Sequence, residues 1–138
     1  MSHHSMAILL FLVFAASGAF AQSKTVPEAS ANPGKKTYMQ YCASCHGTDA
    51  RGTGPAGGAL RTQPADLTTL AARHGGQFPY EYVSDVLRFG RKFSSHGSSD
   101  MPIWGPIFNS KEGFDQARVK MRIKELCDYL ASLQQKES

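Results

Sequence analysis

Residues 42–46 are Cys42-Ala43-Ser44-Cys45-His46, a C-x-x-C-H pentapeptide. This pattern is the attachment signature of a c-type haem, in which two thiols add to the two vinyl groups of one porphyrin. The three-residue offset puts both sulfurs on one side of a helical turn, and His46 follows at once as a proximal ligand for the iron. The pentapeptide alone is a moderately specific signal, so its meaning depends on the rest of the chain.

The cysteine pair has two other interpretations, a structural zinc site and a disulfide. A zinc site wants a second pair of ligands, which one C-x-x-C pair with an adjacent His does not supply. An oxidising compartment would favour a disulfide, yet two haem-linked cysteines and one free thiol, Cys127, account for the three cysteines of the chain better than any disulfide set does. We therefore expect one covalently attached haem c, anchored by Cys42 and Cys45.

The first residues of the chain are predicted to be a secretory signal. Residues 7–20 form an apolar run of 14 residues, which is too short to span a bilayer, where about 20 are needed. Ala19-Phe20-Ala21 is an A-x-A-type cleavage site, so we predict a signal peptide over residues 1–21 and export to the periplasm. No Lys or Arg precedes the apolar run, which leaves an uncleaved anchor as the alternative; we expect no stable membrane anchor.

The remaining sequence is long enough for one domain. We expect a flexible leader over residues 22–33 and a single domain over residues 34–134. The formal net charge is +4 with no basic block, which disfavours nucleic-acid binding and suits docking on redox partners that carry acidic patches. The candidate rim charges for such docking are Lys35, Lys36, Arg51, Arg61 and Lys92.

Capping residues and apolar spacings predict an all-α chain, with no long strand pattern. One helix is expected over about residues 34–42, capped by Asn32 with Pro33 in its first turn. A short helix opens at Pro64, with Asp66 as its cap, and stops at Gly75. Two more helices are expected, over about residues 79–89 and from Asp115 onward, the last with a clean apolar stripe. That stripe consists of Val119, Ile123, Leu126, Leu130 and Leu133.

Two positions in these helices carry a more specific expectation. Gly34 and Tyr38 lie one turn apart, an arrangement that would let another helix cross closely, although a Gly in a first turn can also be merely tolerated. Cys127 falls on the margin of the apolar stripe, where we expect a small, semi-buried hydrophobic residue.

A glycine-rich loop follows the pentapeptide. Gly52-x-Gly54-x-x-Gly57 matches a dinucleotide-binding fingerprint, but no strand pattern precedes it and Pro55 removes one N–H group that a phosphate would need. We interpret the loop as wrapping the edge of the haem, with the carbonyl of Pro55 accepting the Nδ1–H of His46. An ordinary turn proline is the alternative.

The sixth ligand of the iron decides the chemistry. Met101 is the favoured candidate, because Pro102 stiffens the backbone at the end of a polar loop and a thioether is a soft ligand. His96 is its rival, and His74 is a weaker candidate. With both axial positions filled, the iron has no open site for a substrate, and its oxidation state can change with little rearrangement. The expected function is then electron transfer, without catalysis of bond making by the chain itself.

The order of these motifs resembles that of class I, soluble monohaem cytochromes c of bacterial type, over about residues 34–133. The matching segments are Tyr38-x-x-Tyr41 with the pentapeptide, Gly52–Pro55, Pro64–Thr68, Met101–Gly105 and the last helix with Leu126, Tyr129 and Leu130.

The resemblance implies a cytochrome c fold of four to five helices around one covalent haem. It makes His46 and Met101 the axial pair and Pro55 the acceptor for His46. Leu67 and Trp104 become further cofactor-binding residues; Trp104 would lie near a propionate or, alternatively, pack in the core.

The chain departs from the family pattern at Ala50, where glycine is common. If that site needs a positive φ, alanine costs about 1 kcal/mol there, and the loop would run differently.

The resemblance implies a soluble carrier between respiratory or dehydrogenase partners. A cytochrome subunit of an oxidoreductase complex is an alternative. A protein that reacts with gases or peroxide is another, if Met101 is labile.

Overall fold

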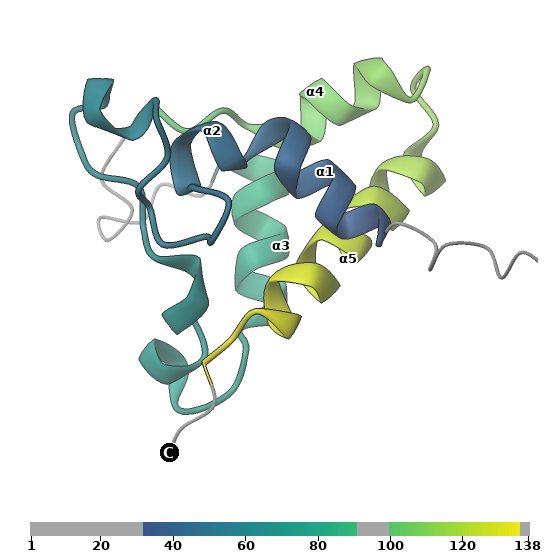
Figure 1. The fold of residues 1–138 in the computed structure, drawn as a ribbon. Coiled ribbons are helices and arrows are strands. Elements are labelled where there is room, and N and C mark those ends of the chain that lie inside the picture. Colours follow the sequence, from purple (N-terminus) through teal and green to yellow (C-terminus); the bar gives the residue numbers. More distant parts are fainter. Residues whose placement is uncertain (1–31, 91–99, 136–138) are drawn as a thin grey trace, which may run out of the picture.

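A computed structural model describes residues 32–90 and 100–135 of the chain. The described part contains five α-helices, three short 3₁₀ turns and no strand, which confirms the all-α prediction (Figure 1). The helices are α1 (Pro33–Tyr41), α2 (Ala43–His46), α3 (Tyr80–Phe89), α4 (Trp104–Lys111) and α5 (Gln116–Ser132), and the turns are η1 (Gly57–Ala59), η2 (Leu67–Thr69) and η3 (Ala72–His74). Within these residues, no helix combines the length and the apolar character that crossing a membrane requires.

Some predictions concern residues outside the described part. The predicted signal segment, residues 1–21, lies there, as do nearly all of the predicted leader and two single residues, His96 and Lys92.

Helices α1 and α5 pack against each other (Figure 1), and they approach closely at Gly34, as the sequence suggested. A Cβ atom on Gly34 would overlap the backbone oxygen of Glu125, so only glycine permits this close approach. One turn further on, the ring of Tyr38 packs on that of Tyr129 with centroids 5.4 Å apart. Tyr38 and Leu126 are fully buried beside the crossing, so the helix pair forms the centre of the core.

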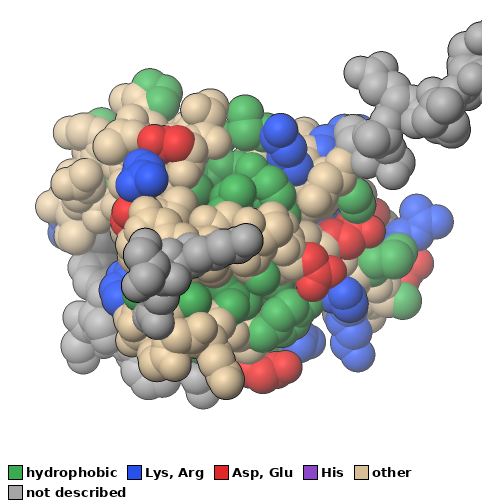
Figure 2. All heavy atoms as spheres, turned by 60° about the horizontal axis from the view of Figure 1, so that its bottom comes forward, with side chains coloured by type: hydrophobic (Ala, Val, Ile, Leu, Met, Phe, Trp, Pro, Cys, Tyr) green, Lys and Arg blue, Asp and Glu red, His purple; other side chains and the backbone are tan. Residues whose placement is uncertain are grey.

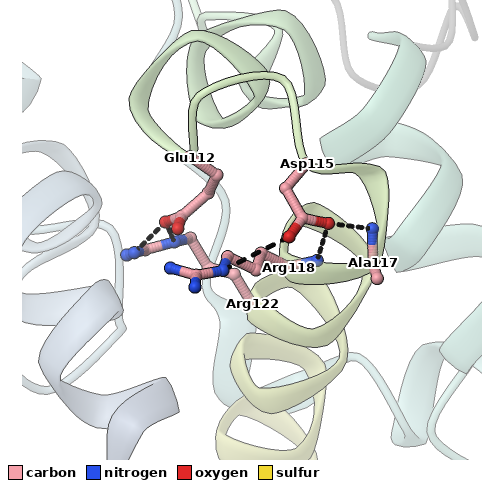
Figure 3. A network of polar contacts seen from close by, with 5 residues as sticks. All are labelled: Glu112, Asp115, Ala117, Arg118 and Arg122. Carbon is pink, nitrogen blue, oxygen red and sulfur yellow. Dashed lines mark hydrogen bonds and ion pairs between the residues drawn. The ribbon is translucent and has the colours of Figure 1, made fainter.

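The predicted caps are present. The side chain of Asn32 accepts a hydrogen bond from the N–H of Lys35 (3.1 Å), and Asp115 accepts from the N–H groups of Ala117 and Arg118 (2.9 and 3.2 Å; Figure 3). These bonds satisfy backbone donors that the first turn of a helix leaves without partners. Gly90 ends α3 in the left-handed conformation.

The short helix expected from Pro64 is instead a pair of 3₁₀ turns, η2 and η3. Asp66 is the predicted cap and accepts from Thr68. Its carbonyl oxygen, however, accepts side-chain bonds from Thr69 (3.3 Å) and Arg73 (2.6 Å). Side-chain bonds of this kind offer the backbone an alternative to the α-helical ladder, which accounts for the tighter turns.

Helix α4 was not predicted, because Gly105 and Pro106 look like helix breakers. Both residues lie in the first turn of α4. A proline there lacks only an N–H that would have no partner within the helix. A Cβ atom on Gly105 would overlap the backbone oxygen of Arg88, so glycine lets α4 approach α3 closely.

A polar network fixes the end of α4 against α5 (Figure 3). The Nε of Arg122 donates to the Glu112 carboxylate at 2.7 Å, and a second nitrogen of the same guanidinium also contacts that carboxylate. Arg122 additionally reaches the hydroxyl of Thr37 on α1 (3.5 Å). One side chain therefore joins three helices, and the neighbouring Arg118–Asp115 pair (3.3 Å) supports the start of α5.

Candidate cofactor site

The helices enclose a cavity of about 190 Å³. Its walls come from the pentapeptide region, the segment of residues 60–67, helix α3, the start of α4 and the inner side of α5. Most of the residues that line it are apolar: Tyr38, Tyr41, Leu60, Pro64, Ala65, Leu67, Leu70, Tyr82, Val83, Val86, Leu87, Pro102, Trp104, Leu126 and Leu130. Hydrophobic side chains also reach the surface, where Figure 2 shows them gathered at the centre of one face with charged side chains around them.

Cys42 and Cys45 both line the cavity. The N–H groups of Cys45 and His46 donate to the carbonyl of Cys42 (3.1 and 2.9 Å), and this turn places both thiols on the same cavity wall. Cys42 is only 8% exposed, and its burial, with a smaller effect from Cys45, raises the pKa of its thiol to about 12. Both sulfurs are free thiols and can serve as anchors for a cofactor.

The third cysteine, Cys127, is also a free thiol and is fully buried on α5, deeper than the predicted margin position. Burial raises the pKa of its thiol to about 12. It does not line the cavity and acts as a small core residue.

The imidazole of His46 lines the cavity, and a backbone carbonyl fixes its orientation. Its Nδ1 lies 3.0 Å from the carbonyl oxygen of Ala65. A carbonyl can only accept, so Nδ1 carries the proton and the neutral ring keeps the lone pair on Nε2 for a metal. Burial lowers the pKa of His46 despite the bond to Ala65, which favours this neutral form.

The acceptor for His46 is therefore Ala65, and the expectation that Pro55 would accept this bond is wrong. Pro55 is exposed and does not line the cavity. Gly52, at φ +81°, lets the backbone of Pro64 come so close that a Cβ atom would overlap its oxygen. The N–H of Leu67 then donates to the carbonyl of Ala50 (2.8 Å), and this packing brings the intervening carbonyl of Ala65 to the ring.

Ala50 adopts the positive φ that the family pattern suggested for a glycine. Its φ is +62°, and its side chain is fully buried. The loop thus adopts the left-handed conformation at this position despite the Cβ atom, at a cost of about 1–2 kcal/mol.

Met101 and Trp104, from a later part of the chain, also line the cavity. Met101 is 40% exposed, whereas Trp104 is buried. The Trp104 ring lies 5.5 Å from the rings of both Tyr41 and Phe108, so it packs in an aromatic cluster at the cavity wall, as the core-packing alternative has it. Leu67, the remaining predicted contact, also lines the cavity.

Of the two histidine alternatives to Met101, only His74 lies within the described residues. His74 does not line the cavity, and its Nδ1 bonds the carbonyl of Leu70 (2.8 Å). His96 lies outside the described residues.

The residues of the cavity fit a haem. Two thiols, an imidazole with a free Nε2 and a thioether share one apolar space, and these are the donor types that c-type haem uses. Among the residues that the structure describes, no group of three or more His, Cys, Asp and Glu side chains could hold a metal ion by itself.

A helical fold over the described residues, with a C-x-x-C-H segment on the wall of an apolar cavity, defines a c-type cytochrome. The family described as "Cytochrome C oxidase, cbb3-type, subunit III" matches residues 29–113, more than half of the chain, and the chain therefore belongs to this family. No curated protein and no solved structure is significantly similar to it. The family implies haem c as the cofactor and haem-based electron transfer as the role of the domain.

Proposed function

We propose that this protein carries single electrons on one haem c, attached covalently to Cys42 and Cys45, with His46 and Met101 as axial ligands in the manner of class I cytochromes. The observation that carries the proposal is that these four side chains line one cavity. When bound, the haem would supply a one-electron Fe(III)/Fe(II) couple.

The chain's own residues would keep that couple reversible. Ala65 fixes the ring orientation of His46, as hydrogen-bond partners of metal-bound histidines do. The apolar side chains of α3 and α5 in the cavity, such as Val86 and Leu126, exclude water. Met101 would occupy the remaining axial position and leave none for a substrate, so the chain acts as a carrier and not as an enzyme.

Covalent attachment can be tested by extraction with acidified acetone, followed by the pyridine haemochrome spectrum of the protein fraction. The colour should stay with the protein, and it should be lost from the double variant Cys42→Ser, Cys45→Ser. Release of the haem into the solvent from the wild-type protein would contradict covalent attachment.

The axial role of Met101 gives a first mutational prediction. Met101→Ala should remove the weak far-red absorption band of a methionine–iron bond, turn the oxidised iron high-spin, lower the reduction potential and let the reduced protein bind carbon monoxide. Met121→Ala is a matched control, because Met121 is an exposed residue of α5 outside the cavity, and it should leave the spectrum unchanged.

An unchanged spectrum in Met101→Ala would point to His96 as the ligand. Rapid carbon monoxide binding by the wild-type protein would instead favour a protein that reacts with gases or peroxide.

A cytochrome subunit of an oxidase complex is the second candidate, favoured by the family to which the chain belongs. Both candidates place the protein in the periplasm, with residues 1–21 as a cleaved signal, residues 22–33 as a leader and residues 34–134 as the cytochrome c domain. Mass spectrometry of the mature protein tests the cleavage. Migration of the native haem protein alone or within a large complex separates the two candidates.

The proposed partners are redox proteins with acidic docking patches. Four of the candidate rim charges are exposed: Lys35, Lys36, Arg51 and Arg61. If they steer docking, the association rate with the partner should fall steeply as salt rises. A rate that does not depend on salt would remove the charged rim from the proposal.

A further inference from the structure

Asp100 joins two segments of the cavity wall that are far apart in the sequence. Its carboxylate Oδ2 accepts a hydrogen bond from the backbone N–H of Arg61 at 3.2 Å, across 39 positions of the chain. Asp100 and the next residue, Met101, both line the cavity, as do Leu60 and Thr62 on either side of Arg61. The bond therefore connects the start of the Met101 segment to a second segment that lines the same cavity.

The segment of residues 61–65 is itself in contact with the residues around the pentapeptide. At its far end, the carbonyl of Ala65 holds the ring of His46 at 3.0 Å. Pro64, in the middle, is packed against Gly52. A short stretch of backbone thus contacts His46 at one end and the neighbour of Met101 at the other.

Met101 needs such an anchor because its own packing is weak. Its side chain is 40% exposed, and that of Ile103 is 45% exposed. The next buried residue along the chain is Trp104. A bond at Asp100 restrains the chain on the other side of Met101, which lowers the conformational entropy that the thioether would lose when it binds the iron.

We propose that Asp100 is a positioning residue, whose hydrogen bond from the Arg61 N–H holds Met101 at the axial position of the iron. This inference rests on the proposed function, in which Met101 is the sixth ligand. It assigns the role to the acceptor oxygen of Asp100 and not to its charge.

The test is a titration of the oxidised holoprotein with imidazole, which competes with Met101 for the iron. Asp100→Ala should bind imidazole about fivefold more tightly than wild type, because the acceptor for the Arg61 N–H, and with it the net contribution of an ordinary hydrogen bond, is lost when Met101 is bound. Asp100→Asn keeps an acceptor oxygen and should stay within about twofold of wild type. Equal binding by Asp100→Ala and wild type would overturn the proposal, and so would equal binding by the Asn and Ala variants.

A second pair of variants removes the donor and leaves Asp100 intact. Arg61→Pro deletes the N–H, and the preceding residue, Leu60, already has the extended conformation (φ −88°, ψ 150°) that a following proline requires. It should raise imidazole affinity as Asp100→Ala does, and the double variant should add little to either change. Arg61→Ala keeps the N–H and should behave as wild type. A full effect of Arg61→Ala would contradict the role of the backbone donor.

Asp115→Ala separates this role from general destabilisation. Asp115 also accepts backbone N–H bonds, but at the start of α5 and outside the cavity. Asp115→Ala should lower the melting temperature and leave imidazole binding unchanged. A tighter imidazole complex in Asp115→Ala would show that loss of stability alone explains the effect.

Two sets of results distinguish a failure of the role proposed for Asp100 from a failure of the proposed axial pair. If Met101→Ala loses the far-red band while Asp100→Ala binds imidazole as wild type does, only the positioning role fails. If the spectrum of Met101→Ala is the same as that of the wild-type protein, the axial assignment of Met101 is wrong, and the role proposed for Asp100 is then wrong as well.

Discussion

Residues 42–67, which supply one part of the cavity lining, are joined by a dense set of backbone hydrogen bonds; we call this segment the His46 wall. Gly52 donates to His46 (2.7 Å), Gly54 to Cys45 (3.1 Å) and Ala56 to Ser44 (2.8 Å). Residues 100–104 supply another part of the lining, and we call them the Met101 wall. They are held by the bond from Arg61 to Asp100 and by the buried ring of Trp104.

The difference between the walls corresponds to different tasks. The His46 wall holds both anchoring thiols and one axial residue in a geometry that its own backbone defines, so its residues should govern stability. The Met101 wall leaves its ligand candidate partly exposed. Its residues should therefore govern access to the iron, with smaller effects on folding.

The largest effect is expected when the His46 wall is broken at Gly52. Gly52→Ala would place a side chain at φ +81° and overlap the backbone of Pro64. Strain and overpacking together should lower the free energy of unfolding by about 3 kcal/mol. The midpoint of urea unfolding of the holoprotein measures the loss.

Gly58→Ala is the matched control, because nothing lies within 4 Å of the added Cβ atom and its φ is not positive. It should leave the midpoint nearly unchanged. Equal losses in the two variants would show that the approach of Pro64 to Gly52 does not hold the wall together.

A contrast between local features and features that depend on tertiary contacts explains what could be predicted from the sequence. The cap at Asn32, the crossing at Gly34 and the cap at Asp115 depend on properties of single residue types, and all three are present. The pentapeptide is equally local. Such features are visible in the sequence because the residue itself carries the signal.

Other features leave no signal of that kind. Ala65 acts through its carbonyl oxygen, a group that every residue has, so nothing marks Ala65 as the acceptor in place of Pro55. Helix α4 was missed because the roles of Gly105 and Pro106 depend on their place in its first turn and on the approach of α3. The link from Arg61 to Asp100 depends on tertiary structure alone.

The Met101 wall can be disturbed at Gly105, with a smaller effect on stability. In Gly105→Ala, overlap with the backbone oxygen of Arg88 is partly offset by the better helix propensity of alanine. We expect a net loss of about 1 kcal/mol in the free energy of unfolding. Because α4 begins at Trp104, the displacement should also loosen Met101 and tighten imidazole binding.

Ser110→Ala, at an exposed position of the same helix, is the control and should change neither quantity. If Gly105→Ala destabilises the protein as much as Gly52→Ala does and leaves imidazole binding unaltered, the assignment of access to the Met101 wall is wrong.

The smallest effect concerns the strain within the His46 wall, at Ala50. Ala50→Gly relieves about 1–2 kcal/mol of left-handed strain but removes a buried methyl group worth about 0.8 kcal/mol. We expect a net gain in stability of less than about 1 kcal/mol. Ala56 provides the comparison, since its φ of −85° carries no such strain and Ala56→Gly should cost about 0.5–1 kcal/mol. The melting temperatures of the two variants check this, because they should change in opposite directions. An equal decrease in the melting temperatures of Ala50→Gly and Ala56→Gly would mean that the buried methyl group, and not the backbone strain, dominates at Ala50.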